Sequence, residues 1–238
     1  MYLLLLAQAL AGTVVIVPDE GLGGAAAESQ LSEELSRLGA DVTVVMREPV
    51  QGETTDAALD AAFNTDDLDY VVALGPRMAV AARARTSFPV PVIAAIDLSP
   101  DPPPKGLISL QIDVAPDDAI ATMERLVGGR VAIVGMDPEQ ARRLDRPVLP
   151  AKADVVLPEG IVGLVVPPLI GHSIADQKTL FAAWTSRGIP ALALFSDLDI
   201  GAPAVTGRSG LSAAVRRLAL VISDLNAGRK PNPRPLTI

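Results

Sequence analysis

Short runs of consecutive apolar residues alternate along the chain with longer segments in which apolar residues recur every three or four positions. The runs predict strands buried on both faces, and the longer segments predict amphipathic helices. In the first half, strands are expected at 13–17, 41–46, 70–74 and 90–96, with helices at about 54–63 and 77–85. An earlier helix carries Leu31, Leu35 and Leu38 on one face and ends at Gly39. This alternation is typical of a parallel sheet covered by helices.

A proline-rich stretch, DLSPDPPPKG at 97–106, interrupts this alternation, and its four prolines exclude a helix or a central strand. A second alternation follows an extended segment at 107–113, with a helix opened by Pro116, strands at 130–135, 161–166, 190–195 and 202–206, and helices at 138–144, 175–187 and 209–227. The predicted fold is α/β, with two Rossmann-like parallel-sheet lobes and a cleft between them. The expected organisation is a candidate signal peptide at 1–11, an N-terminal lobe at 12–98, a proline-rich crossover or hinge at 99–110, a shortened C-terminal lobe at 111–228 and an extended tail at 229–238.

Composition narrows the classes of function. The net charge of −8 argues against a nucleic-acid partner, because phosphate binding needs a basic face. The chain has no cysteine, which excludes disulfides, thiolate catalysis and zinc–cysteine sites, and a single histidine excludes a histidine-rich metal site. Aromatic residues make up only 3%, so the core must consist mostly of Ala, Val, Leu and Ile.

The first eleven residues, MYLLLLAQALA, combine a short apolar run with two overlapping A-x-A patterns, which resembles the end of a secretory signal peptide. This favours export, and hence a periplasmic protein, although the segment is short and has no Lys or Arg. A buried N-terminal strand or a misplaced start site are the alternatives. Neither this run nor any later one is long and apolar enough to predict a membrane span.

A glycine-rich turn follows the first strand, where Gly21, Gly23 and Ala26 match G-x-G-x-x-A. The dinucleotide fingerprint turns directly out of its strand, whereas here Pro18, Asp19 and Glu20 intervene and the two carboxylates would repel a pyrophosphate. We therefore interpret the turn as a flexible strand-to-helix loop whose glycines let the backbone approach a ligand. No set of residues supplies acid, base and nucleophile together, so the sequence predicts no enzyme, cofactor or metal site.

Several segments resemble, in order, the ABC-transporter substrate-binding proteins of the type I periplasmic-binding fold, the group that includes tryptophan and tyrosine binders. They are DYVVALGPRMAVAARARTSFPVPVIAAIDLSP, LISLQIDVAPDDAIATMERLVGGRVAIVGMDP, LVVPPLIGHSIADQKTLFAAWTSRGIPALALFSD and the closing stretch from Gly201, and they cover most of 65–238. The chain departs from the family in a shortened passage between Asp137 and Ile161. It also has Pro76 in place of a hydroxyl residue and Pro168 in place of an aspartate.

The resemblance implies a periplasmic protein that binds a small molecule, such as an amino acid or small organic acid, between its lobes. It would present this ligand to an ABC permease or act with another envelope protein complex. The cleft candidates are residues at strand ends: Asp19, Glu20, Gly75, Pro76, Arg77, Asp97, His172 and Ser196. The planar guanidinium of Arg77 suits a ligand carboxylate. Two alternatives stay open: a ligand-free relative acting as a periplasmic scaffold, and a cytoplasmic α/β nucleotide-binding protein or enzyme.

Overall fold

The chain forms two compact units. The computed structural model describes residues 12–50, 52–99, 101–113, 116–136, 144–169, 172–194, 201–205, 210–231 and 236–237. Unit 1 comprises Met1–Asp19, Gly24–Gln111 and Ser212–Arg234, and unit 2 comprises Glu20–Gly23, Ile112–Leu211 and Pro235–Ile238. The chain therefore passes from one unit to the other at more than one point.

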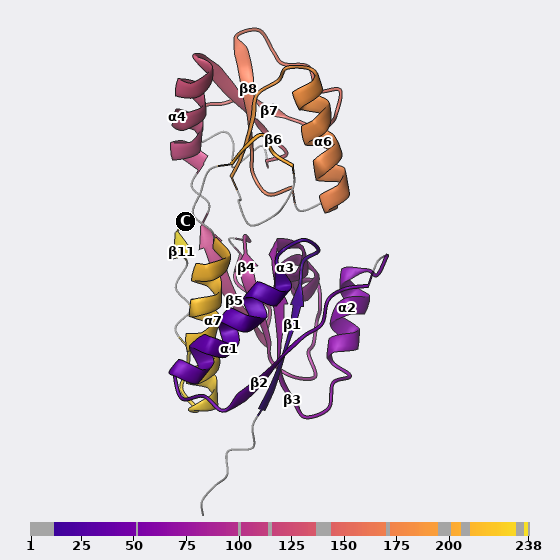
Figure 1. The fold of residues 1–238 in the computed structure, drawn as a ribbon, viewed down its shortest axis with the longest axis vertical. Helices are drawn as coiled ribbons and strands as arrows, with labels where there is room; N and C mark the ends of the chain where they lie inside the picture. Colours follow the sequence, from indigo (N-terminus) through magenta and orange to yellow (C-terminus); the bar gives the residue numbers. More distant parts are fainter. Residues whose placement is uncertain are drawn as a thin grey trace, which may run out of the picture. The chain divides into compact units, whose positions relative to one another are not determined.

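The first sheet has six parallel strands, of which all but β11 and the end of β5 belong to unit 1 (Figure 1). Its strand order is β11-β5-β4-β3-β1-β2. The strands are β1 (Gly12–Pro18), β2 (Val42–Met46), β3 (Leu68–Leu74), β4 (Val92–Asp97), β5 (Leu107–Asp113) and β11 (Leu236–Thr237). The sheet is accompanied by α1 (Gly24–Arg37), α2 (Thr55–Ala62), α3 (Pro76–Arg83) and α7 (Gly210–Asn226).

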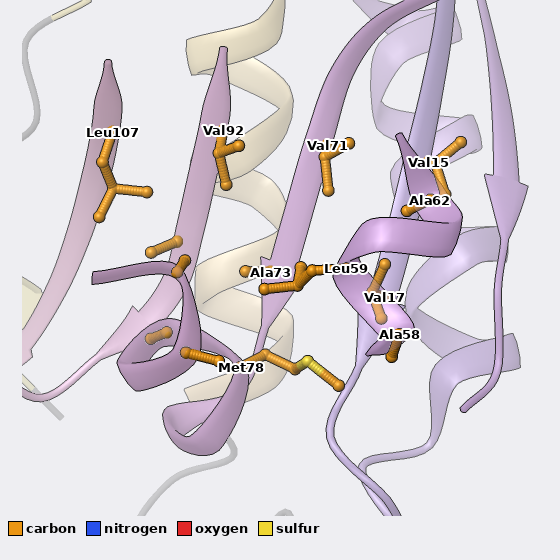
Figure 2. Packing of buried hydrophobic residues seen from close by; sticks show 14 residues of the cluster. Val15, Val17, Ala58, Leu59, Ala62, Val71, Ala73, Met78, Val92 and Leu107 are labelled. Carbon is orange, nitrogen blue, oxygen red and sulfur yellow. The ribbon is translucent and has the colours of Figure 1, made fainter. Parts of the chain in front are cut away.

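Helices cover both faces of this sheet. α2 and α3 pack on one face, where small and branched side chains fill the core, and α7 lies behind the strands on the other (Figure 2). α7 also contacts α1, since Gln30 Nε2 donates a hydrogen bond to Ser212 Oγ at 2.8 Å. The labelled core residues are Val15, Val17, Ala58, Leu59, Ala62, Val71, Ala73, Met78, Val92 and Leu107. The buried residues of this cluster include no aromatic side chain, whereas Phe63 and Phe88 pack against it from partly buried positions.

Unit 2 contains a five-stranded parallel sheet with the strand order β10-β9-β8-β6-β7. Its strands are β6 (Arg130–Val134), β7 (Val148–Leu149), β8 (Ile161–Val166), β9 (Ala191–Ala193) and β10 (Ala204–Val205). α4 (Pro116–Val127) packs against this sheet through Ala119, Ile120 and Met123. α6 (Ile174–Ser186) buries Phe181 and Trp184, whose rings meet edge to face at 5.3 Å between centroids. The indole N–H of Trp184 donates to the carbonyl oxygen of Lys152 at 2.9 Å, so this buried polar group is satisfied.

The predicted fold class, α/β with two parallel-sheet lobes, is confirmed. The structure differs from the predicted organisation in two respects. First, two segments belong to another part of the fold than expected. The extended segment after the proline-rich stretch is β5, a strand of the first sheet. Most of α7 is grouped with unit 1, although this helix follows unit 2 in sequence. Second, Leu38 is 42% exposed, because α1 ends at Arg37 and Leu38 already lies beyond the helix. The candidate signal peptide at 1–11 and all but the last residue of the expected helix at 138–144 fall outside the described residues.

Among the helices of the described residues, none is long and apolar enough to cross a membrane.

Replacing Phe181 by Ala should lower the free energy of unfolding by about 3–5 kcal/mol, because it removes a fully buried ring and leaves a cavity beside Trp184. The chain has a single tryptophan, so intrinsic fluorescence in a urea titration reports on this cluster directly. Leu126→Ala, at a side chain that is mostly exposed in the same unit, is the control and should change stability by less than about 0.5 kcal/mol. Equal effects of the two substitutions would contradict the packing described here.

Candidate site at the carboxyl edge of the first sheet

The candidate residues of unit 1 follow strands that end at the same edge of the sheet. β1 and β3 are parallel neighbours, so Asp19 after β1 and Gly75 after β3 come close together. Backbone hydrogen bonds extend the pairing beyond the strands: Asp19 N donates to Leu74 O at 2.7 Å, and Gly75 N donates to Ala95 O at 2.9 Å. The two turns are thereby fixed to the sheet.

The carboxylate of Asp19 caps the first turn of α3. Its Oδ2 accepts a hydrogen bond from Arg77 N at 2.9 Å, and its Oδ1 accepts one from Met78 N at 2.8 Å. Negative charge is favourable at this end of a helix, where backbone N–H groups lack partners within the helix. Pro76 occupies the first helical position, where a backbone N–H is not needed.

Gly75 makes room for this carboxylate. Its φ of +116° is one that side chains with a Cβ rarely adopt, and a Cβ there would lie 2.6 Å from Asp19 Cγ. A residue other than glycine would therefore both strain the backbone and displace the acid.

Burial raises the pKa of Asp19 to about 6, because only 3% of the residue is exposed and the charged form loses hydration. The hydrogen bonds from Arg77 N and Met78 N, together with the positive charge of Arg77, act in the opposite direction and hold the pKa below what burial alone would give.

The side chain of Arg77 is half-buried next to this acid. Within the described residues its guanidinium forms no ion pair, whereas Arg47, Arg83 and Arg85 of the same unit each do. Glu20, the next residue after Asp19, is exposed. Of the predicted site residues, the structure thus brings Asp19, Gly75, Pro76 and Arg77 together around the start of α3.

Asp97, the last residue of β4, lies at the same edge but is fully engaged with the protein. It is 1% exposed, and its Oδ2 accepts from Arg83 Nε at 2.8 Å and from the hydroxyl of Ser109. Arg83 also donates to the carbonyl oxygens of Asp101 and Pro102, and therefore holds the proline-rich loop against the sheet. The residue before Asp97, Ile96, has a φ of +66°, a strained conformation for a β-branched side chain.

The glycine-rich turn has features that oppose a phosphate cradle. Gly21 and Gly23 have φ values of +77° and +61°, and the turn is grouped with unit 2 although both flanking elements belong to unit 1. The carboxylate of Glu48 lies so close to Gly24, the first residue of α1, that a Cβ there would clash with it. A carboxylate in this position opposes a phosphate at the start of α1. Within the described part of the chain, no cluster of His, Asp and Glu residues is suited to a metal ion.

His172 belongs to unit 2 and is half-buried in the loop after β8. Ser173 caps α6, and Gln177, almost fully buried, donates from Nε2 to the carbonyl oxygens of Leu169 and His172. Sequence analysis did not single out Gln177 or Arg83, because their roles depend on contacts with loops and not on a local sequence pattern. Ser196, the remaining candidate, falls outside the described residues.

No protein-family model and no curated protein sequence matches this chain. Solved structures do match it, at low sequence identity. A conserved domain protein from Vibrio cholerae has a TM-score of 0.69 at 12% identity and covers 96% of this chain and 89% of its own. An ABC domain in complex with L-Trp from Streptococcus pneumoniae has a TM-score of 0.66 at 12% identity, covering 95% and 89%.

CD0873, a substrate-binding protein with adhesive properties from Clostridium difficile, has a TM-score of 0.55 at 16% identity, covering 96% and 89%. A LacI-family transcription regulator from Clostridium acetobutylicum is also similar. The chain thus has a fold like that of the type I periplasmic-binding proteins.

The buried carboxyl of Asp19 predicts a pH-dependent difference between the wild type and Asp19→Asn. Because the folded protein holds the Asp19 proton more tightly than the unfolded chain, this residue favours folding at low pH, and that contribution is lost as pH rises through about 6. From pH 5 to pH 8 the wild type should lose about 1.4 kcal/mol relative to the variant. Urea denaturation at both pH values checks this, and a difference that stays constant or grows with pH would contradict it.

The ion pair between Arg83 and Asp97 should contribute strongly to stability. Arg83→Met leaves the carboxylate of Asp97 buried without its cation and should lower the free energy of unfolding by about 3 kcal/mol or more. The matched control is Arg37→Met, which removes an exposed arginine paired with Glu33, with an expected loss below about 0.5 kcal/mol. Chemical denaturation of both variants provides the comparison, and comparable losses would refute a structural role for Arg83.

Proposed function

We propose that this protein is a solute-binding protein, which takes a small polar molecule at the carboxyl edges of its parallel sheets. The general rule for open α/β sheets supports this location, since ligands bind beyond the carboxyl ends of the strands. The fold also supports it, because structures with this fold include a complex with L-Trp and a protein described as substrate-binding. As the resemblance implies, export and presentation of the solute to an ABC permease, or to another envelope complex, are parts of the proposal.

The observation that carries the proposal is Arg77, a half-buried residue in the first turn of α3, just beyond the end of β3. A charged group that is partly removed from water is expected to have partners, and within the described residues this one has no ion pair, although Asp19 contributes a nearby negative charge. An oxygen atom of a solute would complete its hydrogen bonding, and five N–H donors in a planar fork allow it to bind hydroxyl, carbonyl or carboxylate oxygens.

Transcription regulators share this fold, so the fold alone does not choose between uptake and regulation. The net charge of −8 disfavours direct contact of this chain with DNA. We therefore place solute binding for transport ahead of regulation.

The second candidate function is that of an interaction module in the envelope. In this case the protein is related to solute-binding proteins but has lost its ligand. The observation that favours it is the engagement of Asp19 and Asp97, two of the expected ligand contacts, with the protein itself. Stable co-purification with an envelope complex, in the absence of any bound small molecule, would favour this candidate.

Thermal unfolding across a panel of amino acids, small acids, amides, amines and sugars tests solute binding. A solute present at 100 times its Kd should raise Tm by roughly 5–10 °C. Arg77→Ala should weaken binding of that solute by about tenfold or more, since a hydrogen bond to a charged group is lost. Arg125→Ala, at an exposed position of α4, is the control and should bind like the wild type. A panel in which no compound shifts Tm would count against the proposal.

A further inference from the structure

The first turn of α3 has no backbone N–H left for a ligand. Pro76 has no N–H, those of Arg77 and Met78 are bound to the carboxylate of Asp19, and that of Ala79 donates to Gly75 O at 2.9 Å. The N–H groups at the start of a helix are the ones that normally bind an anion. Here every one of them is either absent or already used.

The group that uses them has the geometry of a bound anion. Both oxygens of the Asp19 carboxylate accept hydrogen bonds from successive N–H groups, and the side chain is almost entirely shielded from solvent. Gly75 has no side chain at the point where the carboxylate is closest to the backbone. The acid is supplied from the end of another strand, 58 residues away from Arg77 in sequence.

The helix that follows β1 also has an acid near its start. At the start of α1, the carboxylate of the exposed Glu48 lies against Gly24, again at a residue without a side chain. At α3, where the acid is buried and hydrogen-bonded, the electrostatic preference of the helix end for negative charge is met by the chain itself.

We infer that Asp19 is a built-in anion, which fills the anion-binding position at the start of α3 and excludes carboxylate and phosphate groups of solutes from it. A second negative group beside the buried acid would meet Coulomb repulsion in a poorly hydrated place and would find no free N–H. This part of the edge is therefore directed to solutes whose contacting group is neutral, because a positively charged group would be repelled by Arg77. Arg77 then serves as a donor to a neutral oxygen. This consequence for the solute class rests on the proposed function, whereas the role of Asp19 as an internal anion does not.

Replacing the internal anion by an external one tests the role of Asp19. Asp19→Ala removes the carboxylate and leaves the N–H groups of Arg77 and Met78 unpaired in a space of about the size of formate. Sodium formate, compared with sodium chloride at equal ionic strength, should raise Tm of this variant by about 3 °C or more. The wild type should show no such difference between the two salts.

The matched control is Asp117→Ala, which removes an exposed acid from the first turn of α4, also directly after a proline. It should respond to the two salts like the wild type. The inference is overturned if formate stabilises the wild type as much as Asp19→Ala, or if Asp19→Ala gains no more than Asp117→Ala. If Asp19→Ala does not fold in either salt, the same comparison is made with Asp19→Ser, whose hydroxyl can accept one of the two N–H groups.

The solute class is tested separately, with carboxylic acids and their primary amides offered in pairs to the wild type. We expect the amide to bind more tightly than the acid, and the preference to shift toward the acid in Asp19→Ala. A wild type that prefers the acid overturns the assignment of solute class while solute binding itself stands. If neither member of any pair binds, the proposed function and the solute class fail together, and the formate comparison still decides whether Asp19 is an internal anion.

Discussion

The cap that Asp19 places on α3 is the interaction on which the carboxyl edge of the first sheet depends. One buried carboxylate joins the turn after β1 to the helix after β3, and the backbone of the same residue is bonded to Leu74. Gly75 supplies the positive φ and the space that the carboxylate needs, and Pro76 occupies a helical position at which no N–H is required. The cost of burying the charge is visible in the raised pKa of Asp19, and two N–H groups and a helix end offset it.

A second constraint acts two strands further along the same edge. The buried pair of Asp97 and Arg83 fixes the proline-rich loop, which would otherwise cross the edge without regular structure. Both acids of this edge are therefore engaged in hydrogen bonds within the protein. Arg77 differs from them, since its guanidinium has no ion-pair partner among the described residues. For this reason we propose Arg77 as the solute contact.

Similarity to solute-binding proteins and to regulators follows from one shared scaffold of two parallel-sheet units. In such a scaffold the sheets position whatever side chains follow the strands, and the chemistry of those few residues determines what is bound. The internal acid at α3 would give this protein an edge with an electrostatic character of its own, distinct from what the fold by itself implies.

The sequence by itself determined the succession of strands and helices, because local periodicity reflects which faces are buried: β1, β3, β8 and α6 lie where the apolar pattern predicts them. It also placed Asp19, Gly75, Pro76, Arg77 and Asp97 at strand ends. Only the tertiary structure decided what these residues do. The bonds from Asp19 to Arg77 and Met78, and the return of α7 to the first unit, join segments far apart along the chain. Local pattern carries no information about such pairings, since they arise from strand order and from the need to satisfy buried polar groups.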